Sequence, residues 1–319
     1  MEKHIPCLAQ NGNATRTASP PSNLAIDWQE LMNCYLHKES ERSIATQRFQ
    51  HRVNLCRAWG IAPGSHILDI GCGQGESALV LSSFNGSSGL VTAIDTAPEG
   101  YGGPYTLVEA QAFIAASPLG PRIRFYSIDT PTLLASNNPS PPRFDYAVLC
   151  HSLWYFADEA TVSNLFEHLA RARVGRVCLA EYTGRADTPD QLAHALAAAA
   201  QMLLVASRKP RQRVQDWNVR VSLFPADLIR IAESQGWKIQ RTGTMKAPDG
   251  LVDGHREARM VQSDLFREAA RAECLEPHVE AELLSLSERV RGACKELADR
   301  GAQVRCMDIF WAVLTLDDE

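Results

Sequence analysis

The sequence lacks the features that mark several common classes of protein. Its nine cysteines are spread singly, without a Cys-x-x-Cys pair or histidines at zinc-ligand spacing, so neither a zinc site nor a disulfide framework is expected. No run approaches the roughly 20 apolar residues of a membrane span, and the first residues contain no apolar signal core. The formal charge of −5 gives no basic footprint for nucleic acid or anionic lipid. We therefore expect a reduced, cytoplasmic protein without a metal ion, a membrane or a nucleic acid as partner.

The chain of 319 residues divides into segments of different composition. Residues 1–24 are polar and contain Gly12, Pro20 and Pro21, so we expect a disordered tail. Residues 25–60 repeat apolar side chains every three or four positions, which predicts a helical lid. Residues 61–250 form the predicted core, residues 251–302 a helical insert, and residues 303–319 the last core strand. An insert of this length usually covers a site.

Seven runs have the composition of β-strands, and helical segments of crossover length separate most of them. The strand candidates are 66–71, 90–95, 122–129, 144–152, 175–182, 238–245 and 305–316. The helix candidates between the first of these are 76–84, 106–117, 159–172 and 189–206. This alternation predicts an α/β protein with a parallel sheet and helices on both faces.

The stretch LDIGCGQGESALVL, residues 68–81, leads from an apolar strand into a glycine turn, which brings backbone amides close to a ligand. Its glycines are Gly71, Gly73 and Gly75, and Glu76 stands where a dinucleotide-binding turn has its third glycine. A negative charge beside a pyrophosphate is unfavourable, so the turn fits a nucleotide without one.

Three acids accompany the turn at the carboxyl edge of the expected sheet. Asp69 can orient the turn or face the cationic end of a nucleoside that carries an amino acid. Asp95 ends the second strand, where a carboxylate can accept both hydrogen bonds from a ribose diol. Asp129 ends the third strand, where an adenine amino group would lie. The pattern is typical of an adenosine with a positive charge elsewhere, and S-adenosylmethionine fits that description.

Four stretches resemble, in order, the motifs of class I S-adenosylmethionine-dependent methyltransferases: ILDIGCGQGESALVLS, VTAIDTA, FYSID and FDYAVLCHSLWYFAD. The resemblance implies a Rossmann-like α/β fold with a seven-stranded, mostly parallel sheet and an antiparallel last strand. More narrowly, DTAPEGYGGPYTLVEAQ, HSLWYF and LAEY are similar to small methyltransferase-like proteins of fungal secondary metabolism.

The resemblance also implies which residues hold the cofactor, S-adenosylmethionine. Carried over by position, they are Gly71, Gly73, Gly75, Asp95, Asp129, Thr130 and Cys150, and we add Tyr35, Asp69 and Thr96 as further cofactor-binding candidates. The glycines would approach the methionine and ribose, the acid ending the second strand would hold the ribose hydroxyls, and the acid after the third would border the adenine. For Asp69 and Asp129 the alternative is a loop or helix cap, and for Tyr35 it is ordinary packing.

Methyl transfer from a sulfonium needs little covalent help, so such an enzyme mainly aligns a nucleophile and excludes water. A hydroxyl acceptor also needs a base, and histidine suits that role near neutral pH. The catalytic candidates are His151 after the fourth strand, Glu181 at the end of the fifth, and His194 in an apolar helix. Each could instead be structural: a hydrogen-bonded histidine in two cases, and for Glu181 a helix cap or an ion pair with Arg185.

We therefore predict an S-adenosylmethionine-dependent methyltransferase that acts on a small-molecule acceptor from secondary metabolism, with O- or N-transfer ahead of C-transfer. Two alternatives stay open. The chain could use the bound cofactor without methyl transfer, as a cyclase would, or it could be a non-catalytic cofactor-binding regulatory partner. The basic run RKPRQR at 208–213 is isolated, and we interpret it as a solvated loop. The apolar helix at 189–206 is expected in the core, although it could also line an acceptor tunnel or a homodimer interface.

Overall fold

A seven-stranded sheet forms the centre of the structure, a computed structural model that describes residues 26–135, 143–208, 219–221 and 223–317. The strands are β1 (His66–Ile70), β2 (Leu90–Asp95), β3 (Ile123–Ser127), β4 (Tyr146–Cys150), β5 (Arg176–Tyr182), β6 (Trp237–Met245) and β7 (Ile309–Leu316). Their order is β3-β2-β1-β4-β5-β7-β6. Strands β1 to β5 pair in parallel, whereas β7 is antiparallel to both β5 and β6. The expected mostly parallel sheet with an antiparallel last strand is confirmed.

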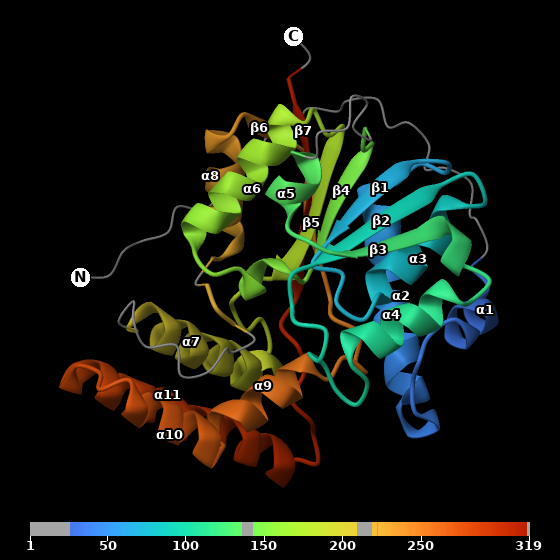
Figure 1. The fold of residues 1–319 in the computed structure, drawn as a ribbon. Helices are drawn as coiled ribbons and strands as arrows, with labels where there is room; N and C mark the ends of the chain where they lie inside the picture. Colours follow the sequence, from blue (N-terminus) through green and yellow to red (C-terminus); the bar gives the residue numbers. More distant parts are fainter. Residues whose placement is uncertain (1–25, 136–142, 209–218, 222, 318–319) are drawn as a thin grey trace, which may run out of the picture.

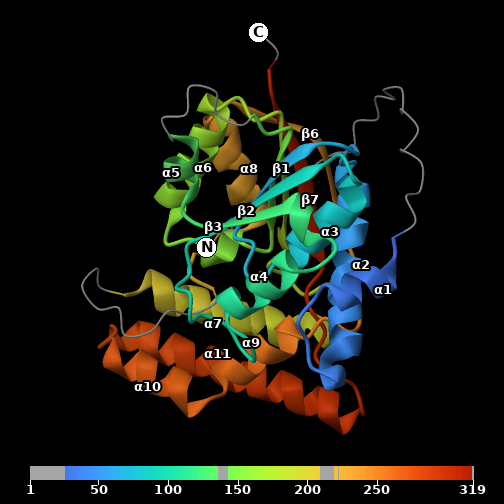
Figure 2. The same cartoon turned by 45° about the vertical axis from the view of Figure 1, so that its right-hand side comes forward.

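Helices cover both faces of the sheet, as Figures 1 and 2 show. One face carries α1 (Trp28–Asn33), α2 (Arg42–Trp59), α3 (Glu76–Asn85) and α4 (Leu107–Ala115). The other face carries α5 (Thr130–Leu134), α6 (Glu159–Arg171) and α8 (Pro225–Ser234). Because both faces are covered, the central strands are mostly apolar, and all five residues of β4 are buried.

A separate helical layer lies below the sheet in Figure 1. It consists of α7 (Leu192–Ala206), α9 (Asp253–Val261), α10 (Asp264–Ala272) and α11 (Pro277–Asp299). These helices bury an apolar core of their own, to which Leu204, Phe266 and Val290 belong. The apolar helix α7 is therefore a core element of this layer, which confirms the first of the alternatives that its sequence left open. Among helices in the described segments, none has the length and apolar character needed to cross a membrane.

The helices begin where the sequence supplies caps. Thr106 and Glu109 form a capping box at α4, and the side chains of Asp129, Asp158 and Ser263 each accept a backbone N–H at the start of α5, α6 and α10. Short 3-10 helices lie in the connections, at Glu39–Glu41, Gly120–Arg122, Leu153–Tyr155 and Pro189–Gln191. Helix α5 has no counterpart among the sequence expectations, because it is a single capped turn without a period to detect.

The last strand is shorter than the sequence predicts. The run 305–316 was expected to be one strand, but β7 begins at Ile309. The residues before Ile309 form hydrogen bonds outside the sheet. The N–H of Arg305 donates to the carbonyl of Asp190, and the N–H of Met307 donates to the ring of His194. Their backbone is thereby fixed against the start of α7 instead of the sheet. The tail at 1–24 and most of the RKPRQR run lie outside the described residues, but Arg208 pairs with buried Glu273 at 2.8 Å.

Candidate active site

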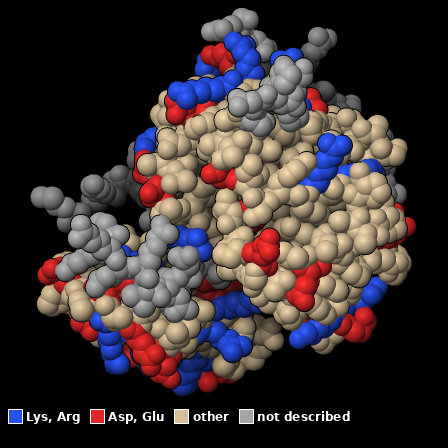
Figure 3. Space-filling view, in the orientation of Figure 1, with Lys and Arg blue, Asp and Glu red and all other residues tan. Residues whose placement is uncertain are grey.

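A cavity of about 830 Å³ lies at the carboxyl ends of the central strands. Residues that follow β1 to β5 form one wall, and residues of α2, α7 and α9 form the opposite wall. The volume is near the upper end of the range for small-molecule sites, about 300–1,000 Å³. Figure 3 shows a crevice where the sheet meets the helical layer, and acidic and basic side chains lie interspersed over this face.

Most of the expected site residues line this cavity. They are Gly71, Gly73, Asp95, Thr96, Asp129, Thr130, Cys150, His151, Glu181 and His194. Three others do not line it. Tyr35 borders a neighbouring cavity of about 260 Å³, Asp69 is buried beneath the turn, and Gly75 packs against α4 and β3.

The three glycines of the turn all have positive φ angles, of 72°, 53° and 91° in chain order, which glycine adopts without strain. They differ in what a side chain would meet. An added Cβ would lie 2.6 Å from Ser152 at Gly71 and 2.6 Å from Ile114 at Gly75, so these two permit close packing. At Gly73 a Cβ would meet nothing within 4 Å. Gly73 is therefore the position where the turn leaves room beside the cavity.

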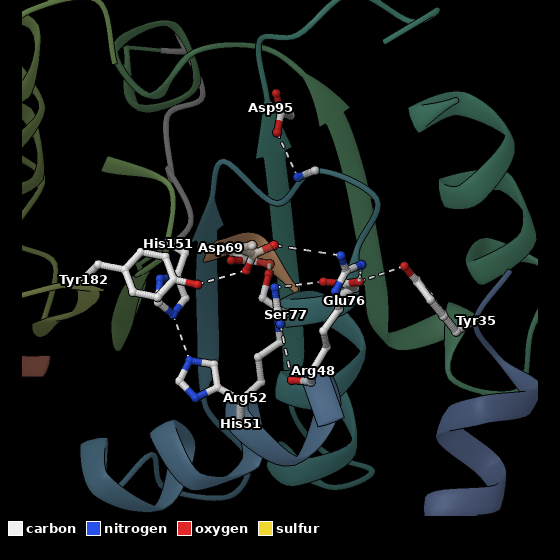
Figure 4. A network of polar contacts seen from close by, with 12 residues as sticks. Tyr35, Arg48, His51, Arg52, Asp69, Glu76, Ser77, Asp95, His151 and Tyr182 are labelled. Atoms are coloured by element: carbon white, nitrogen blue, oxygen red, sulfur yellow. Dashed lines mark hydrogen bonds and ion pairs between the residues drawn. The ribbon is translucent and has the colours of Figure 1, made fainter. Parts of the chain in front are cut away.

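Two acids, Asp95 and Asp129, fix the loops around the open space beside Gly73. The carboxylate of Asp95 accepts the N–H of Gly73 and the N–H of Ala97, each at 2.8 Å, and the first of these bonds is drawn in Figure 4. Asp129 accepts the N–H of Thr132 at 2.8 Å, and hydrogen bonds from Thr132 hold the pKa of the Asp129 carboxyl below its usual value. Asp129 is thus the helix cap that its sequence allowed, and it also borders the cavity.

Asp69 is a buried support for the turn. It accepts the hydroxyl of Ser77 at 2.6 Å, while its second oxygen has no hydrogen-bond partner among the described residues. Burial raises the pKa of Asp69 to about 7. Of its two sequence interpretations, the structure favours orientation of the turn, because the side chain does not reach the cavity.

Replacing Asp69 is expected to change how stability depends on pH. Because the folded-state pKa is raised above the unfolded value of 3.8, the folded chain retains a proton that the unfolded chain loses, so stability falls as pH rises through this window up to about 7. Asp69→Asn should remove this loss, a gain of roughly 2 to 3 kcal/mol at pH 8 relative to pH 5. Urea unfolding at both pH values measures it, and an equal effect at both would contradict the assignment.

Glu76 begins α3 and is enclosed by positive charge. Arg48 and Arg52 each approach one of its oxygens to 2.8 Å, and the hydroxyl of Tyr35 donates to it at 2.8 Å (Figure 4). Burial opposes ionisation, but the guanidinium groups of Arg52 and Arg48 outweigh it and lower the pKa of Glu76 to about 2. Sequence reasoning missed both arginines; their signal is the four-residue spacing that places them on one face of α2.

The two guanidinium groups beside the glycine turn differ in their partners. Both pair with Glu76, and Arg48 also lies 4.0 Å from Asp253. The Nε of Arg52 is buried without a hydrogen-bond partner among the described residues. Since buried donors are normally satisfied, this end of the cavity is suited to an additional anionic group.

The other end of the cavity holds two histidines in contact. The Nε2 atoms of His51 and His151 lie 2.8 Å apart, as Figure 4 shows. Nδ1 of His151 lies 3.5 Å from Glu181. Burial, together with His151 and Arg52, lowers the pKa of His51 well below its usual value, so His51 is neutral. A carboxylate beside Nδ1 of His151 favours a proton there, which leaves its Nε2 to accept the N–H of His51.

Glu181 is held as a buried acceptor. Its oxygens accept the backbone N–H of Tyr182 at 3.1 Å and of Trp154 at 3.4 Å. The sequence alternative of an ion pair with Arg185 is wrong, because Arg185 instead pairs with Asp187 at 3.0 Å. These backbone bonds hold Glu181 with its Oε1 3.5 Å from Nδ1 of His151.

Asp253, in the insert of residues 251–302, contributes to the part of the cavity that holds the histidines. The hydroxyl of Tyr182 donates to Asp253, the first residue of α9, at 2.9 Å. His194 packs edge-on against the Tyr182 ring and accepts the N–H of Met307 at 2.9 Å. Burial lowers the pKa of His194 to about 4. Sequence reasoning could not assign Asp253, since nothing local distinguishes it from other acids in the insert.

Comparison with known proteins places the chain in a family. No family model matches it. Methyltransferases phomM and phomM′ of Diaporthe leptostromiformis are each 39% identical over 344 aligned residues, which cover 89% of this chain and 88% of the relative. A solved cyclopropane-fatty-acyl-phospholipid synthase-like protein from Lactobacillus casei is 28% identical, covers 90% of this chain and 98% of its own, and has a TM-score of 0.75. With this identity over most of its length, and with this sheet, the chain belongs to the class I S-adenosylmethionine-dependent methyltransferases.

Proposed function

We propose that this methyltransferase acts on an oxygen or nitrogen of a small molecule, and that this molecule is a secondary metabolite. The observation that carries the proposal is one cavity lined by two chemically different sets of residues. The turn end offers glycine backbone and acids, and the far end offers His151, Glu181 and His194. The narrower sequence similarity to proteins of fungal secondary metabolism supports the class of acceptor.

The turn end fits S-adenosylmethionine, which supplies an activated methyl group on a sulfonium. The open space at Gly73 lets the ligand approach the backbone. A carboxylate has about four acceptor sites, so Asp95 retains capacity for a ribose diol after accepting two backbone N–H groups. Asp129 and Thr130 border the position proposed for the adenine.

The two arginines beside the glycine turn fit the methionine carboxylate. Arg52 has the unpartnered Nε, so we assign it as the main contact, with Arg48 beside it. Arg52→Gln should weaken binding of S-adenosylhomocysteine about 10- to 100-fold, because a hydrogen bond to a charged group is lost. Isothermal titration calorimetry on the full chain measures the change.

The matched control for Arg52 is 5′-methylthioadenosine, which lacks the amino-acid portion. Its affinity should be unchanged in Arg52→Gln, since Glu76 keeps its contacts with Arg48 and Tyr35. Equal weakening of both ligands would show that Arg52 only supports the turn.

At the far end, His151 is proposed as the base. An acceptor O–H or N–H would replace the N–H of His51 as donor to Nε2 of His151, and Glu181 would stabilise the imidazolium that forms. The exposed rings of Tyr101 and Tyr155 line the cavity and favour a flat acceptor.

The function is tested by incubating the full chain with S-adenosylmethionine and a panel of small phenols, alcohols and amines. Stoichiometric S-adenosylhomocysteine and a product heavier by one methylene unit are expected for at least one panel member. A converted panel member without S-adenosylhomocysteine would instead support use of the cofactor without transfer. Asp95→Ala serves as the inactive control.

A further inference from the structure

His194 is enclosed by packed residues on several sides. It is completely buried at the start of α7 and lines the cavity. A Cβ on Gly254 would lie only 3.0 Å from its Cγ, so the first turn of α9 packs directly on the ring. The Tyr182 ring meets it edge-on with 4.7 Å between centroids. These contacts leave the imidazole one orientation.

The hydrogen bond from Met307 fixes where the proton of His194 lies. A backbone N–H can only donate, so Nδ1 of His194 must carry the accepting lone pair. A neutral imidazole has one bare and one protonated nitrogen, and the proton is therefore on Nε2. The lone pair on Nδ1 is the only one with which His194 could take a proton from the methyl-accepting molecule, and the N–H of Met307 already occupies it.

The protonated Nε2 has no hydrogen-bond partner among the described residues, although it is buried. Buried donors are normally satisfied, and one left alone in a cavity points to an acceptor atom supplied by a ligand. We propose that His194 donates a hydrogen bond from Nε2 to the methyl-accepting molecule and so selects molecules with an oxygen or nitrogen lone pair near the reacting atom. This inference rests on the proposed function and separates the two histidines: His151 accepts the proton, and His194 positions the molecule that loses it.

The groups that face His194 keep it neutral. Burial lowers its pKa, Asp253 of α9 opposes the change, and His151 after β4 adds to it. Tyr182 and Cys306, the other titratable groups in this cluster, remain protonated at neutral pH because burial raises the pKa of each. The donor is therefore present throughout the neutral range.

Two substitutions at His194 separate its two nitrogens. Asn can still accept the N–H of Met307 but does not reach the Nε2 position, whereas Gln can place an amide N–H near it. With the panel molecule that the chain methylates fastest, His194→Asn should raise KM about three- to tenfold, the effect of one neutral hydrogen bond. His194→Gln should restore much of that loss, and both should keep the wild-type pH profile. An unchanged KM in His194→Asn, or the loss of a pH limb in either variant, would overturn the proposal.

A second measurement does not depend on activity. In the full chain labelled with 15N-histidine and mixed with S-adenosylhomocysteine, the resonances that vanish in His194→Gln should show a protonated Nε2 and a bare Nδ1 from pH 6 to 8. A proton on Nδ1, or titration in this range, would overturn the proposal. If no panel molecule is methylated, the proposed function fails, while this spectrum still decides the state of His194.

Discussion

His151→Gln is expected to lower kcat about 100- to 10,000-fold, the usual contribution of a general base. Gln can still accept a hydrogen bond from His51, but it cannot take up a proton. Affinity for S-adenosylhomocysteine should be unchanged, because none of the contacts that the described residues make at the glycine turn involves this side chain. Steady-state kinetics with the fastest panel substrate, combined with calorimetric titration of S-adenosylhomocysteine, separates the two effects.

Glu181→Gln is the companion variant, since it removes the charge that would stabilise the imidazolium while preserving an acceptor for the N–H groups of Trp154 and Tyr182. A fall in kcat smaller than that of His151→Gln is expected. If His151→Gln instead retains wild-type kcat, the acceptor reaches the site already deprotonated, and the proposed base is wrong.

Asp95→Ala is expected to abolish measurable binding of S-adenosylhomocysteine, a loss of at least about 100-fold. Two effects combine: the ribose loses a charged acceptor, and the N–H groups of Gly73 and Ala97 lose theirs, so the turn is no longer held. Calorimetry measures the binding, and circular dichroism checks that the fold persists. Normal affinity in this variant would show that the cofactor lies elsewhere.

Gly73→Val tests the same site from the side of the backbone. A Cβ at this position would meet no described protein atom within 4 Å, so the expected effects are strain at a φ of 53° and occupation of the space proposed for the ligand. Loss of binding with a folded protein is expected. A valine at position 73 would occupy the space proposed for the ligand. Retained binding in Gly73→Val would therefore contradict the proposed position of the cofactor more directly than retained binding in Asp95→Ala.

Much of the fold could be predicted because its signals are local. Strands β1, β2 and β5 match their expected runs to within about one residue, since each is a short apolar run with glycine or a turn residue nearby. The fourth strand ends earlier than the expected 144–152, because His151 has a φ of 55° and leaves the sheet toward the cavity. A non-glycine residue with a positive φ at the edge of a sheet often marks a functional site, but only the tertiary structure reveals that backbone conformation. The roles of the helical segments 25–60 and 251–302 as lids stay predictions.

The sequence alone determined which wall of the cavity the cofactor motifs form, because parallel strands bring their carboxyl ends to one edge and place the glycines, Asp95 and Asp129 together. Only the tertiary structure decided the opposite wall. The contact of His51 with His151 joins residues 100 positions apart, and that of Met307 with His194 joins residues 113 positions apart. Such contacts depend on how α2 and the insert pack against the sheet, and no local pattern encodes that packing. The proton positions on the two histidines follow from those contacts, and with them the distinction between a base and a hydrogen-bond donor.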